Sequence, residues 1–418
     1  MITQSWAIFL DGYRELNAKK LFWFVLAISL LVVLAFAGLG ITRTGITVLW
    51  WEIPVQMFSR LPPDMLTPGK FYKFVFLQFG IALWLSWIAT VLALVSTASI
   101  IPDFIQGGAV ELTLSKPIGR ARLFLTKYLS GLLFVLLQVS LFTLASFLVI
   151  GVRGGAWEPG LFWSIPIMTL FFSYLYSVCA LLGLLTRSTI AALLLTLLCW
   201  TGLFAVNSLE SIFLFVRANY EERVVAVERD IQRLERDLAS APADDAPPAP
   251  PPPSSIAPDG AKGGLLSTVT DALKNSLRAP PGREDMARRL EQRKGLLPLA
   301  RQDLARWTHV HEISLGVKTV LPKTQDTIEL LRRTLVRTAD LNAFENANDG
   351  GDDAEVDFQF RPNGSGPGTD VRVDPRRIGQ RVRSLQDSRS AAWVIGTSLG
   401  FEFVVLGLAC WIFCRREF

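Results

Sequence analysis

The 418-residue sequence contains only two histidines and four cysteines, and charged residues make up 19% of it. His309 and His311 lack the accompanying cysteine and carboxylate ligands of a metal site, so we predict no metal or cofactor on this chain. The four cysteines lie in or at the end of apolar runs, which excludes a disulfide-stapled secreted domain. The sequence also lacks a Gly-x-x-x-x-Gly-Lys-Ser/Thr phosphate loop, so ATP hydrolysis is not predicted here.

Apolar residues are abundant instead. They make up 50% of the chain, and the mean hydropathy of +0.36 is too high for a soluble globular protein. Residues 210–389 hold 28 of the 37 acidic residues and 27 of the 42 basic ones. The chain is therefore predicted to be a membrane protein with a polar insert, and its excess of Lys and Arg flanks the membrane. A nucleic-acid partner is not predicted.

Six apolar segments are long enough to cross a bilayer as helices, which requires about 20 residues. We place them at residues 21–42, 74–99, 128–151, 161–186, 189–208 and 390–413. An amphipathic interfacial helix is predicted at 1–20. The alternative that the first span is a signal peptide, cleaved near residues 35–37, is less consistent with that preceding helix. The predicted fold is an all-α membrane protein.

Orientation follows from the Lys and Arg residues near the span ends. With both termini in the cytosol, ten of these residues lie inside and five in the short outer segments. The chain then divides into spans 1 to 5 at 21–208, an extracytoplasmic insert at 209–389, and the sixth span with a cytosolic tail at 390–418.

The insert is predicted to be mostly helical and similar to a coiled coil. Val224, Val227, Ile231, Leu234 and Leu238 are spaced as a heptad. A proline-rich linker follows at 242–258, where any helix must end. A second apolar stripe, Ala287 to Trp307, is predicted to pair antiparallel with the first and to be interrupted at Pro298. Another break is predicted at Pro322.

The segment at 100–127, between the second and third spans, carries the most specific motif. Residues 108–111 read Gly-Ala-Val-Glu, residues 115–120 read Ser-Lys-Pro-Ile-Gly-Arg, and the chain ends in Cys-Arg-Arg-Glu-Phe. This pattern resembles the cytosolic loop and tail of ABC type-2 exporter permeases, the transmembrane subunits of ATP-binding-cassette transporters. The stretches Gly-Ala-Val-Glu and Pro-Ile-Gly-Arg depart slightly from the family pattern, and the resemblance covers about 240 residues, without the insert.

The resemblance implies that 100–127 is a coupling segment that docks on an ABC ATPase subunit. ATP and Mg²⁺ would then bind to that partner chain, and this chain would be a non-catalytic subunit of a homodimer or heterodimer in a bacterial inner (cytoplasmic) membrane. The residues assigned to ATPase coupling are Glu111, Lys116, Pro117, Arg120 and Arg122. An alternative role for the basic residues is contact with lipid head groups.

The sixth span carries two further features. Gly396, Gly400 and Gly407 form a small-residue pattern that predicts close helix packing. Glu402 is an intramembrane carboxyl on the opposite side of the helix, where a charge is expensive. Two interpretations of Glu402 stay open: it lines a substrate path or binds a proton, or it is a protonated carboxyl hydrogen-bonded to a neighbouring helix.

Two functions follow as hypotheses. The first is an exporter permease that moves a substrate by alternating access, driven by a separate ATPase. The second is a non-transporting relative that passes ATPase-driven motion through the outer stalk to a periplasmic partner. A membrane-embedded enzyme that uses Glu402 is not favoured, because no second catalytic group accompanies it.

Overall fold

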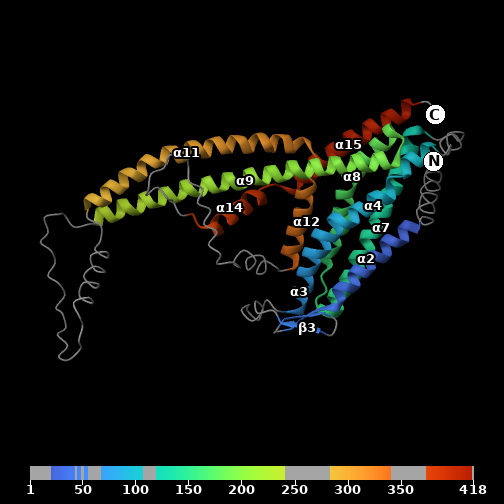
Figure 1. Cartoon of the computed structure of the whole chain (residues 1–418), viewed down its shortest axis with the longest axis horizontal. Coiled ribbons are helices and arrows are strands. Elements are labelled where there is room, and N and C mark those ends of the chain that lie inside the picture. The colour runs from blue at the N-terminus through green and yellow to red at the C-terminus, as the bar shows by residue number, and fades with distance from the viewer. Residues whose placement is uncertain are drawn as a thin grey trace. The chain divides into compact units, whose positions relative to one another are not determined.

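A computed structural model of the chain is shown in Figure 1. It describes residues 20–42, 45–48, 51–54, 67–106, 119–240, 283–339 and 373–416. The chain divides into two compact units. The first comprises Met1–Ile212, Ile313–Val356 and Arg383–Phe418, and the second comprises Phe213–Glu312 and Asp357–Val382. The predicted interfacial helix at 1–20 and linker at 242–258 lie outside the described residues, apart from Lys20.

Nearly all of the described chain is helical. Its elements are α2 (Lys20–Gly38), β1 (Leu39–Thr42), β2 (Gly45–Val48), β3 (Trp51–Pro54), α3 (Pro68–Val75), the π-helix η3 (Phe76–Ala89), α4 (Thr90–Thr97), α5 (Ile100–Gln106), α7 (Arg120–Gly154), the 3₁₀-helix η4 (Pro159–Trp163), α8 (Ser164–Thr186), α9 (Thr189–Ser240), α11 (Arg283–Val320), α12 (Thr324–Ala339), α14 (Pro375–Asp387) and α15 (Ala391–Arg415). The all-α prediction therefore describes the architecture, apart from three short strands.

Five of the described helical segments are long and apolar enough to cross a membrane: Pro68–Gln106, Arg120–Gly154, Pro159–Thr186, Thr189–Ser240 and Ala391–Arg415. They correspond to the second through sixth predicted spans. In place of the first, α2 offers a shorter apolar stretch, Phe22–Gly38. Several apolar helices of this kind fit a multi-pass membrane protein.

The first predicted span, 21–42, was too long at its end. The helix stops at Gly38, and Leu39–Thr42 instead pairs antiparallel with β2, which pairs antiparallel with β3. The register places Ile41 opposite Ile46 and Ile46 opposite Ile53. β-Branched residues favour extended backbone, but they are as apolar as the residues of a transmembrane helix. A hydropathy count therefore included this strand in the span.

The core of the first unit is formed by α2, α7, α8 and α15, with η3 and α4 against them (Figure 1). The largest of its fully buried side chains are mostly aromatic, and they include Phe124, Phe134, Phe142, Phe171, Phe172, Tyr174 and Tyr176. Tyr128 stacks on Tyr176 with ring centroids 5.0 Å apart. Gly131 permits this contact between α7 and α8, because a Cβ atom at residue 131 would overlap the Tyr176 phenol.

The second unit contains a helical hairpin, as the heptad predicted. Val227 and Ile231 of α9 pack against Leu290 of α11, with Leu234, Leu238 and Leu297 around them. Ion pairs flank this contact at Arg293–Asp230 (3.6 Å), Lys294–Glu235 (3.0 Å) and Arg301–Glu228 (2.8 Å). Farther along, Trp307 stacks on Tyr220. The predicted interruption at Pro298 was wrong, because α11 continues through this residue. Proline removes one backbone hydrogen-bond donor, and the packing of the neighbouring helical turns outweighs this loss.

The predicted break at Pro322 is confirmed, because α11 ends at Val320 and α12 begins at Thr324. Residues 321–323 therefore bring the C-terminus of one helix beside the N-terminus of the next. This junction belongs to the first unit and positions the charged residues described below.

A paired substitution tests the packing of the first unit. Gly131→Ala is expected to destabilise the protein by about 1–3 kcal/mol, because the added methyl group overpacks the contact with Tyr176. Gly400→Ala is the matched control on α15: nothing approaches within 4 Å of a Cβ atom there, so it should be neutral or stabilising by roughly 0.5–1 kcal/mol. The measurement is the apparent melting temperature in one detergent, and equal melting temperatures for the two variants would contradict the α7–α8 contact.

Candidate functional site

Only part of the predicted coupling segment lies within the described residues. Glu111, Lys116 and Pro117 fall outside them, since the description stops at Gln106 and resumes at Gly119. On either side, residues 100–106 form α5 and residues 120–127 form the first turns of α7. At these two ends of the predicted coupling segment, Ile101, Leu123 and Phe124 are buried in the helical core.

Arg120 and Arg122 lie in the first turn of α7. The Arg120 guanidinium donates to the carbonyl oxygens of Cys414 (3.2 Å) and Arg416 (2.8 Å). The last carbonyls of a helix have no partner within it, so a guanidinium there caps the helix and matches its dipole. Arg120 therefore holds the C-terminus of α15, a role that the sequence did not indicate.

The helix ends on this side of the first unit are linked further. Arg416 donates to the carbonyl of Leu184 in α8, and the Gln106 side chain donates to the carbonyl of Arg187. Pro102 of α5 also packs where Gly183 of α8 leaves space. The ends of α5, α7, α8 and α15 are thus linked to one another, and α5 and α7 flank residues 107–118 in the sequence.

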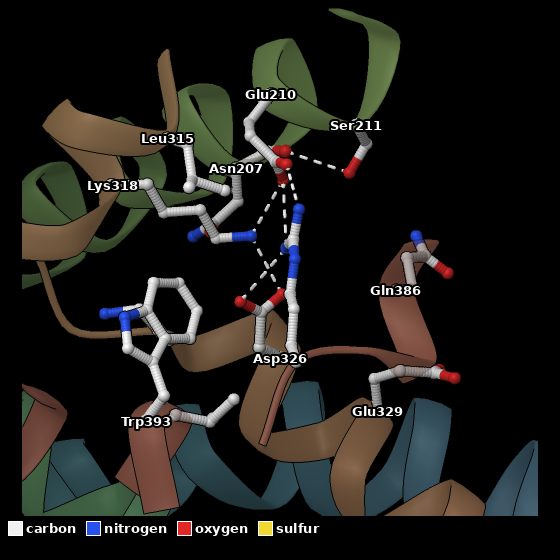
Figure 2. Close-up of polar contacts among 12 residues, drawn as sticks. Asn207, Glu210, Ser211, Leu315, Lys318, Asp326, Glu329, Gln386 and Trp393 are labelled. Carbon is white, nitrogen blue, oxygen red and sulfur yellow. Dashed lines mark hydrogen bonds and ion pairs between the residues drawn. The ribbon is translucent and has the colours of Figure 1, made fainter. Parts of the chain in front are cut away.

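Four charged side chains form a second cluster, which we call the buried charge network: Glu210, Lys318, Asp326 and Arg389. Lys318 Nζ lies 2.9 Å from Glu210 Oε2 and 2.8 Å from Asp326 Oδ1. Arg389 pairs with Glu210 and reaches Asp326 Oδ2 at 3.5 Å. Glu210, Lys318 and Asp326 point toward one another from three different helices (Figure 2). The side chains of Glu210 and Lys318 are only 2% and 3% exposed.

Local sequence explains how the network is assembled. Lys318 lies in the last turn of α11 and Asp326 in the first turn of α12, where each charge matches the adjacent helix dipole. The break at residues 321–323 places these two turns side by side. Glu210 comes from α9, and Arg389 immediately precedes the N-cap residue of α15, Ser390. Two acids and two bases are thereby matched, which offsets the desolvation of each charge.

Lys323 lies beside the network and has a different environment. Its ammonium is 4.2 Å from the centre of the Trp393 ring and donates to the Thr397 hydroxyl and, at 3.3 Å, to the Thr319 carbonyl. Burial lowers the pKa of Lys323 to about 8, Asp326 opposes the shift, and the neighbouring charges of Lys318 and Arg389 add to it. The cation–π contact supplies part of the solvation that the ammonium loses.

The sequence analysis missed the buried charge network. Glu210 was placed just beyond the fifth span and Arg389 just before the sixth, and both were treated as part of a solvated insert. Glu210 and Arg389 carry opposite charges and lie next to the fifth and sixth predicted spans, and this could have predicted that they pair. The pairing with Lys318 and Asp326 was not readable, because it depends on how α11 and α12 fold back.

Glu402 lies inside the first unit and is 7% exposed. Tyr128 Oη of α7 lies 2.9 Å from its Oε1, and Ser173 Oγ of α8 lies 2.8 Å from its Oε2. Glu402 is thus hydrogen-bonded to two neighbouring helices. Gly396, Gly400 and Gly407 lie on the same helix, and nothing is within 4 Å of where their Cβ atoms would be, so they make no close helix contact within the described chain.

The histidines differ from each other in surroundings. His311 is buried, and its Nδ1 lies 3.3 Å from an Arg217 guanidinium nitrogen. Among the residues that the structure describes, no three His, Cys, Asp or Glu side chains are grouped to hold a metal ion. Comparison with known proteins adds no assignment: no family model, curated protein or solved structure matches this chain.

Breaking the buried charge network is expected to be costly. Lys318→Met removes the cation that bridges Glu210 and Asp326, and loss of one partner of a buried pair typically costs about 3–5 kcal/mol. Arg301→Met is the control, because its ion pair with Glu228 is exposed and should contribute less than about 1 kcal/mol. Thermal unfolding in detergent measures both, and a Lys318→Met protein as stable as Arg301→Met would refute the network's structural role.

The lowered pKa of Lys323 predicts that the stability of the folded protein depends on pH. Its folded-state pKa of about 8 lies below the ordinary lysine pKa of 10.5, so between these values the unfolded state binds more protons. Stability should therefore rise with pH through this window, and the penalty is fully present below pH 8. The melting temperature of the wild type relative to Lys323→Met should increase as pH rises from about 8 to 10. Lys294→Met, at an exposed ion pair, should leave the pH profile unchanged, and a flat wild-type difference would contradict the prediction.

Proposed function

We propose that this chain is the permease subunit of an ABC exporter, driven by a separate ATPase subunit. The support from sequence is the motif at residues 108–120 and the tail at 414–418, which resemble those of type-2 exporter permeases. The support from structure is several helices long enough to cross a membrane. ATP and Mg²⁺ belong to the ATPase in this proposal, because this sequence has no phosphate loop.

The observation that carries the proposal is the linkage of helix ends that are adjacent to the motif in the sequence. Gln106 precedes the motif and Arg120 ends it, and these two residues bond to Arg187, Cys414 and Arg416. A force applied to the motif by a docked ATPase would reach the ends of α8 and α15 as well as α5 and α7. Such rigid transmission is what a motion-coupled permease requires.

Alternating access then involves the ATPase cycle tilting these helices. We expect a dimer of permease subunits, homodimeric or heterodimeric, in a bacterial inner membrane with both termini in the cytosol. Residues 209–389 would lie on the outer side. The exposed apolar side chains Phe403, Val404 and Trp411 of α15 suit contact with lipid or with a second permease subunit.

One observation favours the second function, a mechanical coupler that moves an envelope partner instead of a substrate. The helix α9 runs without a break from Thr189 to Ser240, so it contains both the apolar span and the first arm of the helical hairpin. The buried charge network contacts this helix at Glu210, close to the end of its apolar stretch. A continuous helix with such a contact can pass rotation or tilt along its length.

Co-purification tests the ATPase-coupled class. The detergent-solubilised wild type should recover an ATPase that contains a phosphate loop, as identified by mass spectrometry. Glu111→Ala/Lys116→Ala should lose the ATPase without a change in melting temperature. Arg120 is left intact in this variant because it caps α15. Failure of the wild type to recover any ATPase under mild conditions would overturn the proposal.

A matched deletion separates the two functions. Removing residues 228–234 and 293–299 takes one heptad from each arm of the hairpin, which shortens it by about 10 Å while keeping the antiparallel register. An exporter should retain its activity, scored as rescue of a strain lacking the gene. A coupler of fixed length should lose it. Deletion of residues 228–234 alone disturbs the register and serves as the control for a damaged hairpin.

A further inference from the structure

Three helices of the first unit meet at the Glu402 carboxyl. It belongs to α15, while Tyr128 comes from α7 and Ser173 from α8. The carboxyl oxygens lie 2.9 Å and 2.8 Å from the two hydroxyls. All three residues are at most 7% exposed, so each hydrogen in this cluster must be assigned to an acceptor within it.

Counting hydrogens shows that the cluster suits two protonation states. Tyr128 Oη also lies 3.0 Å from the Ser173 carbonyl, and Ser173 Oγ lies 2.8 Å from the Leu170 carbonyl. A phenol and an alcohol each carry one hydrogen, and a backbone carbonyl only accepts. If one hydroxyl donates to its backbone carbonyl, its oxygen accepts the hydrogen of a neutral carboxylic acid, while the other hydroxyl donates to the carbonyl oxygen of that acid. If both rotate toward Glu402, they donate to an ionised carboxylate.

The surroundings decide between these states. Among the described residues, no Lys, Arg or His forms an ion pair with Glu402, and Tyr174 of α8 is the other titratable group within electrostatic range besides Tyr128. Lys127, next to Tyr128 in sequence, lies over the Phe104 ring. From the α12 side, Lys323 is directed to Trp393 and Thr397, and Asp326 belongs to the buried charge network. A buried carboxyl without a cation is more stable when neutral.

We propose that Glu402 is a proton-binding site between α7, α8 and α15, occupied at neutral pH. The two hydroxyls let the proton leave and return by rotating about their C–O bonds, with no displacement of heavy atoms. A carboxylate could not follow α15 into lipid, whereas the neutral acid could. The proton therefore permits α15 to move against α7 and α8. This site does not depend on which of the two functions above is correct.

Infrared difference spectroscopy of the full chain tests the proposal directly. The spectrum of wild type minus Glu402→Gln at neutral pH should show one carbonyl stretch of a protonated carboxylic acid. If the difference contains the two carboxylate stretches instead, Glu402 is ionised and the proposal is wrong. The Gln side chain keeps the size and both hydrogen-bond partners of the acid, so the variant is the mildest available replacement.

A second variant retains the carboxyl and covers the case in which Glu402→Gln does not fold. Tyr128→Phe removes one of the two donors that the ionised form uses, whereas the hydrogen of the neutral acid can still be accepted by Ser173. The carboxylic acid band, which disappears as pH rises, should therefore persist to higher pH than in the wild type. The band is assigned with ¹³C-labelled glutamate. A purely structural role for Tyr128 would leave this pH midpoint unmoved, and an unshifted midpoint would refute the rotating-hydroxyl site.

Discussion

The free energy required to remove a charge from water governs how the charged side chains of the first unit are arranged. Apolar helices supply most of its surface, yet Glu210, Lys318 and Glu402 are almost fully enclosed. Each enclosed charge needs a partner, because the low-dielectric interior penalises an isolated ion by several kcal/mol. The positions of α11, α12 and the segment before α15 follow from this requirement. Their charged residues must meet Glu210 of α9 at one point, although Glu210 and Arg389 are 179 residues apart in the sequence.

Two carboxyls in the unit meet the requirement differently. Glu210 is surrounded by the cations Lys318 and Arg389, and the geometry suits a permanent ion. Among the described residues, Glu402 is hydrogen-bonded to two hydroxyl groups, whose single hydrogens also have backbone acceptors in reach. The first arrangement fastens chain segments together, while the second tolerates the gain or loss of a proton. A fixed contact and an adjustable one thus lie on the same unit, which is consistent with a protein whose helices move while their connections persist.

The helix ends follow the same physical logic. Arg120 supplies donors to the unpaired carbonyls at the end of α15, and Arg416 does so for α8. These bonds give the two basic residues a structural role that a count of Lys and Arg near the span ends does not predict. They also link α7, which follows residues 107–118 in the sequence, to helices that are distant in sequence. In the proposed exporter or coupler, this linkage is the route by which ATPase motion would enter the membrane helices.

Local patterns in the sequence determined the helical class, the longer apolar helices, the heptad contact of Val227 and Ile231, and the break at Pro322. These features depend on periodicity, composition and proline geometry within one segment. The strand at Leu39–Thr42 and the continuity of α11 through Pro298 were decided by pairing and packing partners outside the segment. The buried charge network and the Glu402 cluster each join residues from three or more elements. Only the tertiary structure decided them, because a buried charge or hydroxyl takes whichever partner the folded chain brings within hydrogen-bond distance.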